Sequence, residues 1–127
     1  MNKETLILKL IEMLMGSESS IATNTTPQKE LIGEWVIVRC RDAGVHFGKL
    51  KDYEGREVIL ENSRRMWYWF AAQGHTLSGC AVHGVKQDES KIAAEVKVIV
   101  LPEACEIISC EPKAIKSIGE CDEYQPD

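Results

Sequence analysis

The sequence predicts an α+β fold, in which a small, mostly antiparallel β-sheet or half-open barrel carries an N-terminal amphipathic helix and a short C-terminal helix. Segments rich in β-branched and aromatic residues follow one another between residues 35 and 110, and turn-forming stretches separate several of them. Apolar residues recur every three or four positions near the N-terminus, which is the pattern of an amphipathic helix. Pro112 stands where a short final helix can begin.

The chain divides into four parts on composition. Residues 1–15 form the predicted amphipathic helix, whose apolar positions are Leu6, Ile7, Leu10, Ile11, Leu14 and Met15. The polar stretch 16–30 predicts a flexible linker, residues 31–119 a β-rich ligand-binding domain, and residues 120–127 a loose acidic tail. A helix ahead of a flexible linker can reach another copy of the chain, so we expect a homo-oligomer, a dimer or larger.

Within the β-rich part we expect a meander followed by two further strands. The meander comprises strands over 35–40, 45–50 and 57–61, with the arginine-tryptophan run that begins at Asn62 as a fourth. Residues 71–90 lack a strong period and predict a short helix and a loop. Strands follow over 91–101, with Val96, Val98 and Val100 on one face, and over 104–110, before a final helix over 112–118.

Charge and cysteine content limit the classes of function. The 127 residues carry a formal net charge of −5, which argues against binding duplex nucleic acid through many phosphate contacts but allows a small anionic ligand in a local basic pocket. The five cysteines include no C-x-x-C pair, so we expect neither a metal site nor a cofactor. No signal peptide and no membrane span are expected, which predicts reduced thiols and a cytoplasmic location.

The run from Asn62 to Phe70 carries the clearest chemical signal. Arg64 and Arg65 directly precede Trp67 and Trp69, and alternation along a strand would place Arg65 and both tryptophans on one face. Guanidinium groups bind phosphate or carboxylate, and indole rings stack on planar groups. The run therefore predicts a site for an anionic, planar ligand, although core tryptophans and a solvated pair of arginines are the simpler alternatives.

Two further residues are candidates for ligand contact. His46 lies between Gly44 and Gly48, which let a backbone approach closely, either to a ligand or to another strand. Lys91 stands where the 71–90 loop rejoins a strand, so it could close over a phosphate or simply be solvated. No catalytic residues are expected, because no nucleophile motif and no glycine-rich phosphate loop are present.

Several separated motifs, in residues 32–33, 36–39, 43–48, 62–69 and 105–110, together resemble a small phage-borne family. The resemblance covers about residues 31–118 and points to the first described type of anti-Thoeris protein, a phage sponge. It implies that the protein binds cyclic ADP-ribose isomers made by host TIR enzymes without cleaving them, in the host cell cytoplasm. It also implies assembly into hexamers and binding of cyclic trinucleotides of the CBASS type at separate sites.

Two other functions stay open. A small β-barrel protein-interaction module could use Trp67 and Trp69 to anchor a partner protein. A hydrolase that degrades the signalling nucleotide is the third alternative, disfavoured because no nucleophile or metal set is recognisable in the sequence.

Overall fold

The computed structural model describes residues 30–125, which include five strands, two α-helices and a 3₁₀ turn. The strands are β3 (Trp35–Cys40), β4 (Val45–Glu54), β5 (Glu57–Tyr68), β6 (Lys91–Leu101) and β7 (Ala104–Ser109). The helical elements are α1 (Leu77–His83), η2 (Gln87–Glu89) and α2 (Pro112–Gly119). The helix predicted over 1–15 and the predicted linker up to residue 29 lie outside the described residues.

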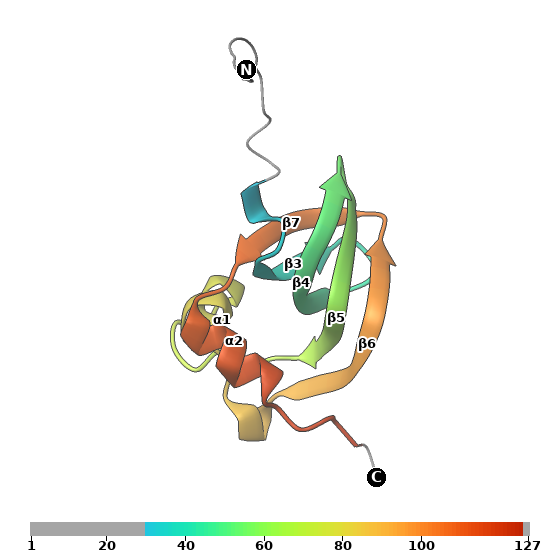
Figure 1. Ribbon diagram of the computed structural model, residues 1–127. Helices are drawn as coiled ribbons and strands as arrows, with labels where there is room; N and C mark the ends of the chain where they lie inside the picture. The colour runs from blue at the N-terminus through green and yellow to red at the C-terminus, as the bar shows by residue number, and fades with distance from the viewer. Residues whose placement is uncertain (1–29, 126–127) are drawn as a thin grey trace, which may run out of the picture. The chain divides into compact units, whose positions relative to one another are not determined.

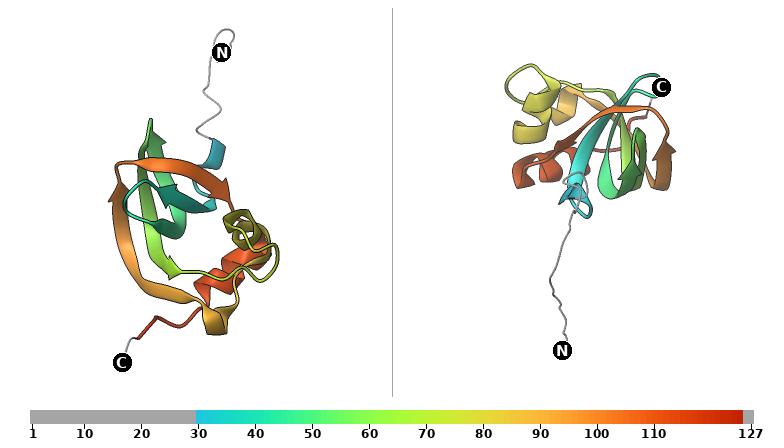
Figure 2. Two further views of the ribbon diagram at one scale, coloured as in Figure 1. Left: turned by 180° about the vertical axis from the view of Figure 1, so that it is seen from behind. Right: turned by 90° about the horizontal axis from the view of Figure 1, so that it is seen from above.

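The five strands form one sheet in the order β6-β5-β4-β3-β7, and every neighbouring pair is antiparallel. Strands β6 and β7 occupy opposite edges, although only Pro102 and Glu103 separate them in the chain. The sheet must therefore curl until its two edges approach, as Figures 1 and 2 show, but β6 and β7 do not pair and the sheet is not closed. The predicted α+β class and antiparallel sheet are thus confirmed.

Strand β5 differs from the prediction, because the segment 57–61 and the arginine-tryptophan run form one strand of 12 residues. One residue of β4, Gly48, lies opposite two of β5, Asn62 and Ser63, and Asn62 has a positive φ of 51°. Asparagine tolerates this left-handed conformation, so the extra residue forms a bulge within the strand and no turn is needed. Opposite the bulge, an added Cβ on Gly48 would lie 3.1 Å from the Glu61 carbonyl oxygen and from Ser63 Cα, so the strands can approach this closely only at glycine.

Two hydrophobic clusters occupy the opposite faces of the sheet. Ile37 and its cross-strand partner Phe47 belong to the first cluster, whereas Val36 and Val38, which point the other way along β3, belong to the second. The first cluster includes Ala81 of α1 and Ile118 of α2, so the helices cover this face. The second cluster fills the inside of the curl with side chains from strands and turns.

The helices begin and dock through local hydrogen bonds. Thr76 caps α1 by accepting a hydrogen bond at Oγ1 from the Gly79 amide at 3.0 Å, and Pro112 begins α2. The Ser117 hydroxyl of α2 both accepts from the Val85 amide and donates to the Val85 carbonyl, at 3.0 and 3.1 Å. These bonds tie α2 to the segment that follows α1.

Candidate functional site

A cavity of about 340 Å³ opens on the sheet face opposite the helices, between β4, β5 and β6. Its position follows from small side chains, since Ala93 and Ala94 of β6 and Ser63 of β5 leave space that larger residues would fill. The full lining consists of His46, Ser63, Arg65, Ala93, Ala94, Val96 and Ile99. Two of these seven residues, His46 and Arg65, are candidates from the sequence, and they lie directly opposite each other in the β4–β5 pairing.

Two residues of this lining each have a buried polar atom without a hydrogen-bond partner in the described part of the chain. These are His46 Nδ1 and Ser63 Oγ, on side chains that are 0% and 1% exposed. His46 Nε2 lies 2.9 Å from the Ala43 carbonyl oxygen, which can only accept, so Nε2 carries the proton. In the neutral ring Nδ1 is therefore an acceptor. A buried polar atom without a partner costs about 1–3 kcal/mol, which a ligand that supplies the partner would recover.

Electrostatics keep the His46 ring neutral. Burial lowers the pKa of His46 from its ordinary value of 6.5, the hydrogen bond to Ala43 opposes this, and the positive charge of Arg65 lowers the pKa further. The exposed Arg65 side chain makes no hydrogen bond or ion pair with any residue in the described part of the chain. Its guanidinium is thus available to an anion at the rim of the cavity.

Arg64 has a different environment from Arg65, because successive residues of a strand face opposite sides. Its side chain is 6% exposed and donates hydrogen bonds to four carbonyl oxygens. The acceptors are Ala93 at 2.8 Å, Ile118 at 3.3 Å, Gly119 at 3.2 Å and Cys121 at 2.7 Å. Arg64 therefore joins β5, β6 and the C-terminal end of α2, and it does not line the cavity.

Trp67 and Lys91 meet in a cluster of exposed aromatic side chains. Trp67 is 62% exposed, and its ring centroid lies 5.3 Å from that of Tyr124. The Lys91 ammonium lies 5.1 Å from the Trp67 centroid, 5.2 Å from that of Tyr124 and 5.7 Å from that of Tyr68. The Tyr124 amide donates to the Ile92 carbonyl at 2.9 Å, which holds this ring beside β6. Sequence reasoning missed Tyr124, because one tyrosine in an acidic tail carries no periodic signal.

Trp69 does not share the face of Trp67. Strand β5 ends at Tyr68, so the alternation of side chains does not continue to Trp69. Trp69 is half-buried and packs against the first hydrophobic cluster, on the side of the helices. The expectation that both tryptophans lie beside Arg65 is therefore wrong, because it extended the strand one residue too far.

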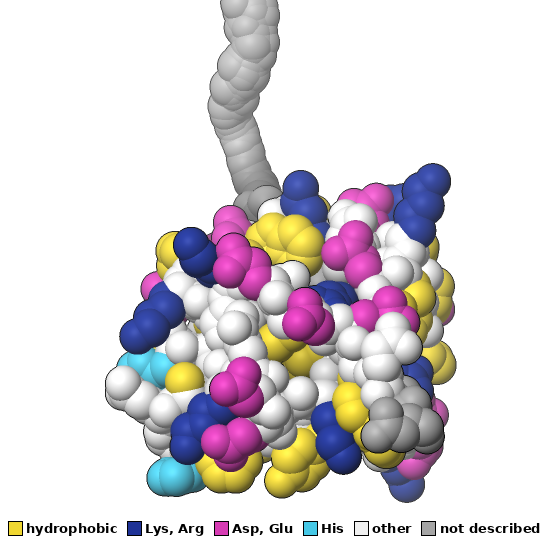
Figure 3. All heavy atoms as spheres, turned by 90° about the horizontal axis from the view of Figure 1, so that it is seen from below, with side chains coloured by type: hydrophobic (Ala, Val, Ile, Leu, Met, Phe, Trp, Pro, Cys, Tyr) yellow, Lys and Arg dark blue, Asp and Glu magenta, His cyan; other side chains and the backbone are white. Residues whose placement is uncertain are grey.

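A second concave surface is a groove of about 570 Å³ between α2 and residues 83–89. It contains three lysines and three acids, namely Lys86, Lys113, Lys116, Asp88, Glu89 and Glu120. Figure 3 shows the molecule from below, and on the side drawn there basic and acidic side chains are intermixed, without a large area of one sign. No unpaired buried polar atom was found among the groove residues, so the smaller cavity is the better ligand site.

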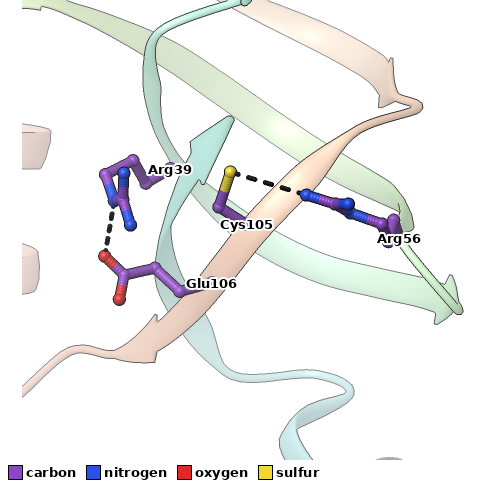
Figure 4. Close-up of polar contacts among 4 residues, drawn as sticks. All are labelled: Arg39, Arg56, Cys105 and Glu106. Atoms are coloured by element: carbon purple, nitrogen blue, oxygen red, sulfur yellow. Dashed lines mark hydrogen bonds and ion pairs between the residues drawn. The ribbon is translucent and has the colours of Figure 1, made fainter. Parts of the chain in front are cut away.

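The cysteines do not contribute to the cavity. Burial raises the pKa of Cys80 to about 11 and that of Cys110 to about 12, so both thiols are protonated at neutral pH. The exposed Cys105 on β7 has the guanidinium of Arg56 3.8 Å from its sulfur, next to an ion pair of 2.7 Å between Arg39 and Glu106 (Figure 4). Within residues 30–125, no three His, Cys, Asp or Glu side chains lie close enough together to hold a metal ion.

Comparison with protein families gives a match over most of the described residues. A family described as a domain of unknown function, DUF6948, matches residues 33–118, which is more than half of the 127 residues. The chain belongs to the DUF6948 family. The matched region includes all five strands and every residue of the cavity, and it ends before Tyr124. No curated protein matches the chain. Among the described helices, none has the length and apolar character needed to cross a membrane.

Proposed function

We infer that this DUF6948 protein binds an anionic nucleotide in the His46–Ser63–Arg65 cavity and holds it without cleaving it. The observation that carries this inference is that His46 Nδ1, Ser63 Oγ and the Arg65 guanidinium all lack a hydrogen-bond partner within residues 30–125. A ligand with hydroxyl groups and phosphate groups would supply partners to all three. The volume of about 340 Å³ lies at the small end of ligand pockets, which suits one nucleoside phosphate unit or part of a larger ligand.

Each side chain has a distinct part in this binding. Arg65 would form charge-assisted hydrogen bonds with a phosphate, while His46 Nδ1 accepts a hydrogen bond from a ribose hydroxyl and Ser63 Oγ donates or accepts one. Trp67 stands two residues after Arg65 on β5, about 7 Å away along a strand that rises roughly 3.3 Å per residue. A planar base could therefore stack on Trp67 while the phosphate contacts Arg65, with Lys91 adding positive charge beside Trp67.

Sequestration of a cyclic ADP-ribose isomer, and of cyclic trinucleotides as a second class, is the specific function that we propose. The lining contains no carboxylate and no thiol, which favours a binder over a hydrolase. The resemblance to anti-Thoeris sponges adds support, and we propose that the activity belongs in the cytoplasm of a phage-infected host, where it would block Thoeris or CBASS signalling. A sponge must bind more tightly than the host receptor, and sub-micromolar affinity corresponds to roughly 8 kcal/mol or more.

Isothermal titration of the full chain with a cyclic ADP-ribose isomer and with a cyclic trinucleotide tests the proposal. Each complex is then heated, and the released ligand is analysed by chromatography. We expect tight binding, intact release, and an affinity at least about tenfold lower for Arg65→Ala, because a charge-assisted hydrogen bond contributes roughly 1.5–3 kcal/mol. Arg41→Ala is the matched control, since Arg41 is also exposed and lies outside the cavity. Equal losses in the two variants, or a cleaved ligand, would contradict the proposal.

One observation favours a second function, a protein-interaction module. The 62% exposure of Trp67, with the half-exposed Tyr68 beside it, is unusual for large aromatic side chains and is typical of an anchor for a partner protein. Trp69, which packs against the core, would not take part in this surface. Absence of heat with either nucleotide, together with a stoichiometric partner that is captured by the wild type and lost in Trp67→Ala, would favour this alternative.

A further inference from the structure

Strand β6 forms an open edge of the sheet. It pairs with β5 on one side only, and β7 lies at the far edge. On the other side, Ile92 at the start of the strand meets Glu123 in a parallel bridge and accepts a hydrogen bond from the Tyr124 amide. Beyond this point, no backbone hydrogen bond joins residues 94–100 to any described segment other than β5. Within residues 30–125, about seven residues of this edge therefore have no backbone partner and can pair with another strand.

This free edge also carries an exposed apolar stripe. Val96, Val98 and Val100 alternate along β6 and are 44%, 47% and 50% exposed, whereas Ile99 between them is half-buried against the second cluster. Edge strands of stable monomers usually carry proline, bulges or several charges that prevent association. Between Val96 and Val100 the only such residue is Lys97. A free edge with an apolar stripe indicates a surface that pairs with another strand.

We propose that two copies of the chain pair through their β6 strands, antiparallel across a two-fold axis at Val98. In this register Val98 of each copy faces Val98 of the other, and Val96 of each faces Val100 of the other, at the 4.5–5.5 Å Cβ separation typical of cross-strand pairs. The pairing extends the sheet of each copy into one sheet of ten strands. The stripe is its own complement, as an interface with two-fold symmetry requires.

Neighbouring registers are less favourable for reasons visible in the chain. A two-fold axis at Lys97 would place the two Lys97 side chains directly opposite each other. An axis at Val96 would require Val100 of one copy to pair with Ile92 of the other, where Glu123 and Tyr124 already occupy the edge. The axis at Val98 avoids both conflicts, and pairing ends at Glu95 and Leu101. One strand pair and six valines form a small interface, so we expect self-association with a micromolar dissociation constant.

Sedimentation equilibrium of the full chain, from low micromolar to several hundred micromolar concentration, measures this association. Val98→Lys places two ammonium groups opposite each other at the axis and should weaken it at least about tenfold. Val82→Lys is the matched control, because Val82 is 46% exposed but lies on α1, away from β6. Mixing Val98→Lys with Val98→Glu should restore association, since opposite charges then meet at the axis.

The sedimentation results decide whether β6 strands pair across an axis at Val98. Concentration-dependent association that Val98→Lys weakens, that Val82→Lys leaves unchanged and that the mixture restores supports the pairing. A wild-type chain that is monomeric throughout the range overturns the proposal, as does an assembly that Val98→Lys does not affect. Weakening without restoration in the mixture also overturns it, because the two-fold axis would then not pass through Val98. None of these outcomes depends on whether the cavity binds a nucleotide.

Discussion

Replacement of Arg64 by alanine should destabilise the fold, whereas the same change at Arg65 should leave the fold intact. Arg64 is 6% exposed and donates to four carbonyl oxygens that connect β6, the end of α2 and Cys121. The alanine variant would leave these acceptors without their donor in a buried place. It would also remove a positive charge from the C-terminal end of a helix, where the helix dipole favours one.

The magnitude follows from the two shortest contacts, which are 2.7 Å to Cys121 and 2.8 Å to Ala93. Each hydrogen bond from a charged donor contributes about 1.5–3 kcal/mol, and contacts that share one guanidinium are not additive. We therefore expect Arg64→Ala to lower the free energy of unfolding by about 3–5 kcal/mol, a large part of the 5–15 kcal/mol typical of a domain. The melting temperature should fall by roughly 12 °C or more.

Urea unfolding followed by tryptophan fluorescence measures the free energy of unfolding of both variants. Arg65→Ala should differ from wild type by at most about 0.5 kcal/mol, because an exposed side chain without partners among residues 30–125 contributes little. The reasoning would be refuted by an Arg64→Ala variant within about 1 kcal/mol of wild type, or by equal losses in the two variants. Either result would mean that the Arg64 contacts do not hold the helix end to the sheet.

Three further predictions concern other residues. The pKa of His46 is lowered in the folded state, so the unfolded chain binds more protons between the folded pKa and the ordinary value of 6.5. The free energy of unfolding should therefore fall as the pH drops through 6.5 toward the folded pKa. Urea unfolding across this range should show a less steep fall in His46→Gln. Iodoacetamide at pH near 8 should alkylate the exposed Cys105 well before Cys80 and Cys110, as measured by mass spectrometry. Burial raises the pKa values of Cys80 and Cys110 to about 11 and about 12, so little of either thiol is the reactive thiolate. Similar alkylation rates at all three cysteines would contradict this reasoning. Gly48→Ala should destabilise the fold by about 1–3 kcal/mol in thermal unfolding, because the added methyl group crowds the neighbouring strand, and an unchanged melting temperature would show that the strands can separate at little cost.

Local patterns in the sequence were enough to predict most elements. Alternating apolar residues identify β3, β4, β6 and β7, because each strand buries one or both faces in the same sheet. Pro112 correctly marks the start of α2. The division of β5 into two strands failed at Asn62, where a residue that commonly ends a strand instead forms a bulge within it. Turn preferences do not distinguish these two outcomes.

The candidate site was predicted only in part. Period-two alternation places Arg64 and Arg65 on opposite faces, but the sequence does not say which face α2 will cover, so their roles could not be separated. Ser63 gave no signal of its own, because a serine in a strand is ordinary until its hydroxyl is buried without a partner. Tyr124 joins Trp67 only because the segment after α2 returns along β6.

The sequence by itself determined the kinds of chemistry that this protein can offer, namely paired arginines, an aromatic run and a histidine between glycines, and the strands that carry them. The tertiary structure decided which of these groups meet. Pairing of β4 with β5 brought His46 opposite Arg65, and packing of α2 enclosed Arg64 in the fold. The reason is physical: periodicity depends on neighbours in the chain, whereas burial and hydrogen-bond partners depend on contacts between residues far apart in it.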